Sequence, residues 1–83
     1  MHLLALRRGG IELVEGKVAP GAPADGRPLR ELGIPVDALV VMVVRGDQTF
    51  IPSGETVLRA DDEVLAVTTP ASEGALRRLL LGA

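Results

Sequence analysis

Arg45 is the charged residue whose position most favours a binding role, because it stands between an apolar run and the turn Gly46-Asp47. An arginine guanidinium is planar and permanently charged, and its fork of N–H groups can hold a phosphate through two hydrogen bonds. In a twofold dimer, two copies of Arg45 would present two such forks to a symmetric diphosphate. A solvated arginine in a turn is the alternative, and the residue types support it equally well.

An acidic group, Asp61-Asp62-Glu63 with Glu55 nearby, could in principle hold a cation. Ca²⁺ takes about 6–8 oxygen ligands, and dedicated loops supply them from a spaced pattern of Asp, Asn and Gly that is missing here. We therefore expect a solubilising turn before a strand. His2 is the single histidine and there is no cysteine, so no metal site is expected.

The sequence offers no set of side chains that a catalysed reaction would need. Ser53 and Ser72 have no base within the chain that could activate them, and no general acid–base pair is visible. We expect a protein that is not an enzyme and requires no cofactor.

Composition excludes two further classes of partner. The net charge of −2 and the single aromatic residue, Phe50, disfavour a nucleic-acid binder. No apolar run approaches the ~20 residues that span a bilayer, and Met1–Leu6 is too short for a signal peptide. Any link to a membrane is therefore expected to pass through a partner, and the absence of cysteine fits the cytoplasm.

The run Ala38–Gly46 is the element that must position Arg45. Its β-branched residues predict a strand, whose alternate residues point to opposite faces. Leu39, Val41 and Val43 would share one face, and Val40, Met42 and Val44 the other. Both faces are apolar and need cover, which a chain of 83 residues is too short to supply alone. We expect a homodimer whose interface is formed by one of these faces, within the set Leu39, Val40, Val41, Met42, Val43 and Val44.

The remaining elements follow from alternation, turn residues and helix punctuation. A Gly-Asp turn after the central strand predicts a hairpin, and Thr69-Pro70 predicts the start of a helix that Gly82 ends. The order β-α-β-β-β-α indicates an α+β domain with a small mixed or antiparallel sheet. The elements of this order are strands at 11–19, 38–46, 48–51 and 63–69 and helices at 24–33 and 70–81, and a further short extended strand is predicted at 56–58.

Residues 1–10 are expected to be an N-terminal extension, or the remnant of a preceding domain, before a domain that covers residues 11–83. They mix leucines with Arg7-Arg8 and Gly9-Gly10. The pattern is compatible with one helical turn ended by Gly9.

From Ile11 to Leu80 the chain resembles the C-terminal domain of regulators of potassium conductance, the RCK or TrkA-C family. The family's Ser-Pro-Leu-x-Gly-Lys-x-Leu-x-x-Leu segment reads here as Ala22-Pro23-Ala24-Asp25-Gly26-Arg27-Pro28-Leu29-Arg30-Glu31-Leu32. An apolar strand then ends in Val43-Val44-Arg45-Gly46-Asp47, and Pro52, Thr56, Val57 and Leu58 follow. The chain departs from the family at Ala22, Arg27 and Asp61, where Ser, Lys and Gly are usual.

The resemblance implies a TrkA-C-like fold and a regulatory role on the cytoplasmic side of a bacterial potassium channel, potassium uptake system or cation/proton antiporter. It implies a homodimer that is peripheral to the inner membrane through a membrane-embedded transporter or channel subunit. In some members the cleft between two copies binds a small ligand such as cyclic di-AMP. Arg45 lies where the family places a phosphate contact, and Val40, Val41 and Pro52 would then flank a base. Asp62 would be a structural turn residue that accepts backbone N–H groups.

Two alternatives remain open. The chain could be a purely structural dimerisation or assembly module that binds no small molecule, whereas an enzyme fragment is disfavoured by the missing catalytic residues. The family's nucleotide-binding N-terminal domain is not present in this sequence. No Gly-x-Gly-x-x-Gly fingerprint occurs, so NAD or ATP binding cannot be transferred from the family.

Overall fold

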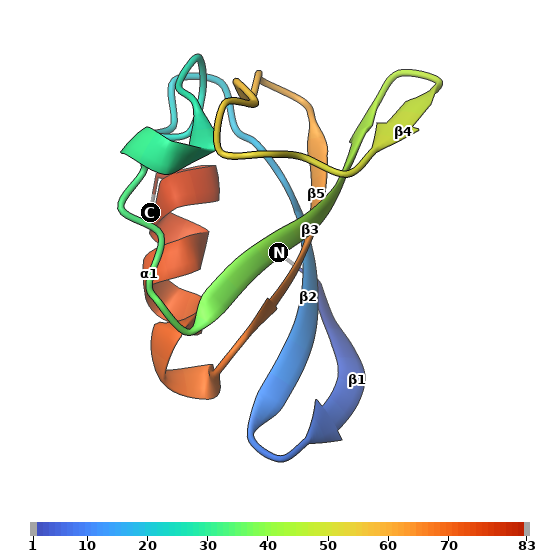
Figure 1. Cartoon of the computed structure of the whole chain (residues 1–83), viewed down its shortest axis with the longest axis vertical. Helices are drawn as coiled ribbons and strands as arrows, with labels where there is room; N and C mark the ends of the chain where they lie inside the picture. Colours follow the sequence, from blue (N-terminus) through green and yellow to red (C-terminus); the bar gives the residue numbers. More distant parts are fainter. Residues whose placement is uncertain (1, 83) are drawn as a thin grey trace.

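Residues 2–82 fold into one five-stranded antiparallel sheet with a single α-helix on one side (Figure 1). The computed structural model describes the backbone of residues 2–82 and the side chains of residues 9–82. The strand order is β1-β2-β5-β3-β4, and every neighbouring pair is antiparallel. The α+β class is therefore confirmed. The elements are β1 (His2–Arg8), β2 (Ile11–Lys17), the 3₁₀ helix η1 (Leu29–Glu31), β3 (Ala38–Arg45), β4 (Gln48–Phe50), β5 (Glu63–Thr68) and α1 (Pro70–Leu81).

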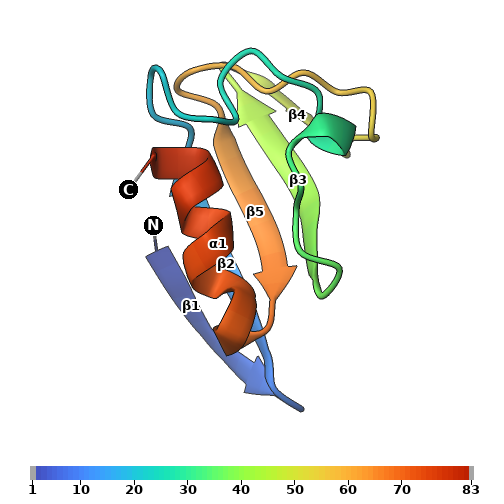
Figure 2. The ribbon, with the colours of Figure 1, turned by 90° about the vertical axis from the view of Figure 1, so that its left-hand side faces the viewer.

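The core lies between the inner face of the sheet and α1, which lies in front of β2 in Figure 2 and contacts β2 and β3. The helix contributes Leu76 and Leu80, which are almost fully buried. They lie four positions apart and therefore share one helical stripe, which faces the strands. The sheet contributes small and β-branched side chains, and the loop before β5 adds Leu58. The buried core residues of the three central strands are Val14, Val40, Val43, Val64 and Ala66.

Helix α1 begins and ends where its punctuation predicts. The Thr69 hydroxyl accepts a hydrogen bond from the Ser72 backbone N–H, and Pro70 occupies the first turn, where its missing N–H costs nothing. Gly82 takes a left-handed conformation with φ of 83° and donates its N–H to the Arg78 carbonyl.

Strand β3 corrects the expected division of its side chains between two faces. Val40 pairs with Ala66 and Met42 pairs with Leu65, so Val41 is an extra residue that forms a β-bulge. The bulge shifts the alternation by one residue. Val40 and Val43 therefore both face the core, while Met42 and Val44 face the other side of the sheet. The alternation of Leu39, Val41 and Val43 on one face was wrong, because a strict period of two assumes an unbroken ladder.

The helix expected over residues 24–33 is reduced to the single turn η1. The segment is held by backbone contacts to the loop before β5: Gly26 N–H to the Leu58 carbonyl, Leu29 N–H to Thr56 and Arg30 N–H to Gly54. Bonds of this kind replace intrahelical ones, because the backbone groups of a folded chain must find partners. The expected strand at Thr56–Leu58 survives as an isolated bridge between Pro28 and Val57.

Residues 2–8 form a strand, β1, rather than the helical turn with which their sequence was also compatible. β1 pairs with β2 through a hairpin at Gly9-Gly10, both of which have positive φ. The domain boundary expected at residue 11 stays a prediction, although β1 belongs to the same sheet as the other strands. Within residues 2–82, no helix combines the length and the hydrophobicity needed to span a bilayer.

Candidate functional site

A surface groove of about 410 Å³ lies between η1, the loop that leads into β3, and the loop after β4. This volume falls within the ~300–1,000 Å³ typical of small-molecule sites. Its walls are mainly apolar, and Arg30 is the charged residue among those that line it. We call this the Arg30 groove. Its apolar lining includes Leu29, Ile34, Val36, Leu39, Val40 and Pro52.

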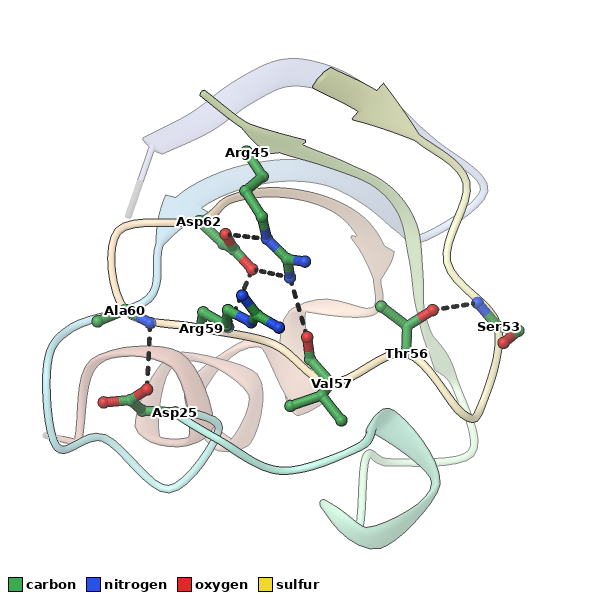
Figure 3. Close-up of polar contacts among 8 residues, drawn as sticks. All are labelled: Asp25, Arg45, Ser53, Thr56, Val57, Arg59, Ala60 and Asp62. Atoms are coloured by element: carbon green, nitrogen blue, oxygen red, sulfur yellow. Dashed lines mark hydrogen bonds and ion pairs between the residues drawn. The ribbon is translucent and has the colours of Figure 1, made fainter. Parts of the chain in front are cut away.

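Backbone hydrogen bonds fix two walls of the groove to each other. Arg30 N–H donates to the Gly54 carbonyl at 2.9 Å, and Leu29 N–H donates to the Thr56 carbonyl at 3.0 Å. The wall formed by the loop after β4 has an internal hydrogen bond, because the Thr56 hydroxyl accepts the Ser53 N–H at 2.9 Å (Figure 3). The groove is therefore a preformed feature of the loops, which lowers the entropy cost of binding.

Arg30 forms ion pairs with two carboxylates. Its Nε lies 2.7 Å from Glu55 Oε1, and its Nη2 lies 3.3 Å from Glu31 Oε2. All three side chains are largely exposed, so these ion pairs are weak and open to exchange with a ligand.

Two large apolar side chains at the groove are open to solvent. Val36 is 104% exposed and Leu39 is 60% exposed, although both line the groove. Ile51, next to the lining residue Pro52, is 84% exposed. Exposed apolar side chains gathered at one place are typical of a binding surface.

Arg45 lies outside this groove and is bound to Asp62 by a two-pronged ion pair (Figure 3). Its Nε donates to Asp62 Oδ1 at 2.9 Å and its Nη2 to Asp62 Oδ2 at 2.7 Å. The Nη2 group also donates to the Val57 carbonyl at 2.9 Å, and the guanidinium carbon lies 5.3 Å from the centre of the Phe50 ring. This arrangement fits neither a freely solvated turn arginine nor one whose fork is open to a phosphate.

Asp62 is buried, with 2% of its side chain exposed, and it lies just before β5. Its Oδ2 accepts the Arg59 N–H at 2.9 Å as well as the Arg45 bonds, so the carboxylate organises the turn. The hydrogen bond from Arg45, more than any other contact, lowers the pKa of Asp62 below its ordinary value. The structural role implied for Asp62 matches these contacts.

Asp37 connects the loop that lines the groove to the start of α1. Its carboxylate accepts hydrogen bonds from the hydroxyls of Ser72 and Thr69, the latter at 2.8 Å. These two hydrogen bonds lower the pKa of Asp37 below its ordinary value, and the bond from Ser72 has the larger effect. Because the Thr69 hydroxyl also accepts the Ser72 N–H, hydrogen bonds connect the groove loop with the N-cap of α1.

Of the four residues expected to bind a ligand, the structure brings Val40 and Pro52 together in the Arg30 groove. Val41 and Arg45 do not line it. The residues that sequence reasoning missed are Arg30 and the apolar loop residues Ile34 and Val36. A signal was present: Gly33-Ile34-Pro35-Val36 is a loop by its glycine and proline, yet it carries apolar side chains that a loop seldom needs.

The residues expected at a dimer contact are also divided by the fold. Val43 is completely buried and Val40 is 7% exposed, so the chain's own core occupies both side chains. Met42 and Val44 point to the side of the sheet opposite α1, and Leu39 pairs with Val67 on that side. We call this side the outer face; among the described side chains, its apolar residues include Leu13, Leu39, Met42, Val44, Leu65 and Val67. In the described part of the chain, no group of three or more His, Cys, Asp or Glu side chains could hold a metal ion.

Comparison with known proteins identifies the family to which this chain belongs. Residues 13–81 match the TrkA-C domain. The chain belongs to the TrkA-C domain family. It is 36% identical over 81 residues to the Trk system potassium uptake protein TrkA of Mycobacterium tuberculosis (strain CDC 1551 / Oshkosh), covering 98% of this chain and 37% of that protein. It is 37% identical over 68 residues to a TrkA homolog of Archaeoglobus fulgidus, covering 82% of this chain and 16% of that protein.

Solved structures share the fold of this TrkA-C domain. The structure of an RCK domain with cda has a TM-score of 0.71 at 22% identity, covering 82% of this chain and 96% of that one. The GsuK channel bound to NAD has a TM-score of 0.78 at 23% identity, covering 95% of this chain and 15% of that one. The chain thus spans little more than a third of the first relative and a small part of the channel.

Proposed function

We propose that this TrkA-C domain is a cytoplasmic regulatory module of a potassium channel, potassium uptake system or cation/proton antiporter. It forms a homodimer and binds a cyclic dinucleotide, of which cyclic di-AMP is the first candidate, in the Arg30 groove. The module catalyses nothing and contacts the membrane only through its transporter partner. The observation that carries the proposal is the preformed apolar groove with one arginine on its rim.

The groove supplies the two kinds of contact that a nucleotide needs. Pro52 and the exposed Val36 offer apolar surface for a base, beside the largely buried Val40, and the Arg30 guanidinium offers a fork of donors for a phosphate. We assign the phosphate contact to Arg30 because its ion pairs are exposed to solvent, whereas Nε and Nη2 of Arg45 are bonded to the buried Asp62 and to the Val57 carbonyl. The names of the relatives support the transport role, and the RCK domain with cda supports a ligand on this fold.

Regulation would follow from the symmetry of the dimer. Two grooves on two copies would receive the two halves of a symmetric cyclic dinucleotide, so the bound ligand would favour one relative arrangement of the copies. The ligand can shift the transporter only by the difference between its affinities for the two arrangements.

The second candidate is a purely structural dimerisation module. The outer face favours it, because six apolar side chains there need cover whether or not a ligand binds. Under this alternative the groove stays empty and the domain only tethers its transporter chains.

Isothermal titration calorimetry with cyclic di-AMP separates the two candidates. We expect binding by the wild type and a loss of affinity of about 10- to 100-fold in Arg30→Gln, the range for a hydrogen bond to a charged group. Arg78→Gln, which removes the same charge from α1, away from the groove lining, is the matched control and should bind as the wild type does. Absence of heat in a dimeric wild type would favour the structural module, and equal losses in both variants would refute the groove.

A further inference from the structure

We propose that Glu55, assisted by Glu31, sets the charge selectivity of the Arg30 groove. The groove accepts a phosphodiester, which carries one negative charge per phosphate, and rejects the more highly charged end of a phosphomonoester. This inference rests on the proposed ligand-binding function of the groove and adds to it the reason for a preference among nucleotides.

The geometry places the two carboxylates where they compete with a ligand for the same donors. Glu55 Oε1 lies 2.7 Å from Arg30 Nε, and Glu31 Oε2 lies 3.3 Å from Arg30 Nη2. A phosphate that takes a two-pronged bond from the Nε–Nη2 edge of Arg30 must displace at least one of them, and a phosphate that uses the remaining donors lies on the same guanidinium as both carboxylates. Glu55 immediately follows Gly54, which lines the groove, so a displaced Glu55 side chain stays close to the bound phosphate.

The balance of charge at this wall explains the selectivity. One arginine faces two carboxylates, so the wall has no surplus positive charge to attract a polyanion. A terminal phosphate carries about −1.5 to −2 at neutral pH, as the same group does in a phosphorylated side chain, and it is repelled more than a diester is. Glu55 should act more strongly than Glu31, because its oxygen lies closer to the guanidinium.

The test compares cyclic di-AMP with AMP on the wild type and on Glu55→Gln, which keeps the shape of the side chain and removes its charge. We expect AMP to bind about two- to fivefold more tightly to Glu55→Gln, the effect of one exposed charge pair. The gain in affinity for cyclic di-AMP should be smaller than that for AMP. Glu31→Gln should gain less affinity for each nucleotide than Glu55→Gln does. Raising the salt concentration should shrink these differences, since exposed charges are screened.

Glu73→Gln is the matched control, because Glu73 also pairs with an exposed arginine, Arg77, but lies on α1 outside the groove lining. The signal of the Arg30 Nε–H group, followed by NMR during each titration, reports binding at the groove. A double variant with Arg30→Gln must lose any binding that Glu55→Gln gains.

The outcomes separate the inference from the function on which it rests. If the wild type binds cyclic di-AMP and Glu55→Gln behaves as Glu73→Gln does, the selectivity role is overturned and the proposed function stands. If only Glu55→Gln binds AMP, through Arg30, the cyclic dinucleotide proposal fails and the selectivity role stands. If no nucleotide moves the Arg30 signal in any variant, both are overturned.

Discussion

Arg45 shows how one side chain can be the structural centre of a loop that borders a site without lining it. Its guanidinium joins the end of β3 to the buried Asp62 and to the Val57 carbonyl, so it fixes the chain between β4 and β5 (Figure 3). That chain continues from the loop wall of the Arg30 groove. We therefore regard Arg45 as a residue that stabilises the fold and thereby positions the groove.

Arg45→Gln is expected to destabilise the domain by about 2–4 kcal/mol, because it leaves the buried Asp62 carboxylate without its charged partner. Urea unfolding followed by circular dichroism measures the change. The free energy of unfolding of Arg45→Lys should lie between those of Arg45→Gln and the wild type, since an amine cannot make both bonds to the carboxylate. A loss no greater than that of Arg78→Gln would contradict the role assigned to the ion pair.

The same pair should give the domain a distinct acid response. The folded state lowers the pKa of Asp62, so the Asp62 carboxylate adds to the free energy of unfolding. This contribution is complete above the unfolded pKa of about 3.9 and is lost as the pH falls through the lowered pKa. Arg45→Gln removes the main cause of the lowered pKa. The stability of the variant should therefore fall less between neutral pH and acid than that of the wild type.

At the scale of the element, Thr69 joins the start of α1 to the groove loop. Its hydroxyl accepts the Ser72 N–H and donates to Asp37. We expect Thr69→Ala to lower the free energy of unfolding by about 1 kcal/mol, because the N-cap hydrogen bond is lost. Thr69→Ser should keep most of that stability, because serine can form the same hydrogen bond. Urea unfolding gives the cost, with Thr49→Ala on the exposed β4 as control, and NMR titration should show the pKa of Asp37 rising. Equal stabilities of the two alanine variants would show that the cap contributes little.

The elements that the sequence predicts well are those with local signals. Thr69-Pro70 and Gly82 marked α1, and Gly46-Asp47 marked the β3–β4 hairpin, because caps and tight turns depend on a few adjacent residues. β3 was placed correctly, but its faces were not. Every residue from Ala38 to Val44 is apolar, so nothing in the run distinguishes a bulge at Val41 from regular alternation.

The groove could be predicted only in part, for a related reason. Val40 and Pro52 were expected at a binding site, but Arg30 reaches them only because its N–H is bonded to Gly54 across 24 positions of sequence. Such a contact is set by the fold and leaves no local pattern. Arg45 was assigned to a ligand because its buried partner, Asp62, lies 17 positions away and reads as part of a solvated acidic turn.

For the whole molecule, the decisive feature is that α1 covers one side of the sheet and no other described element covers the opposite side (Figure 1). The six apolar residues of the outer face are exposed or half-buried, whereas inner-face residues of the same strands, such as Val14, Val43 and Ala66, are buried. A second copy is the simplest cover, because a twofold contact buries the same surface on both chains. The apolar surface that the chain is too short to cover, first inferred from the run Ala38–Val44, thus lies on the outer face of β2, β3 and β5.

Met42→Glu is expected to convert the proposed homodimer into a monomer. Met42 lies on the outer face opposite Leu65, and a carboxylate placed between two such faces would have to lose its water without gaining a partner, at a cost of at least tenfold in the dimer dissociation constant. The fold should survive, because the side chain does not belong to the core. Ile51→Glu, which places the same charge on a solvent-exposed residue beyond β4, is the matched control and should stay dimeric. Sedimentation velocity measures both, and a monomeric wild type or a dimeric Met42→Glu would show that the outer face is not where two copies meet.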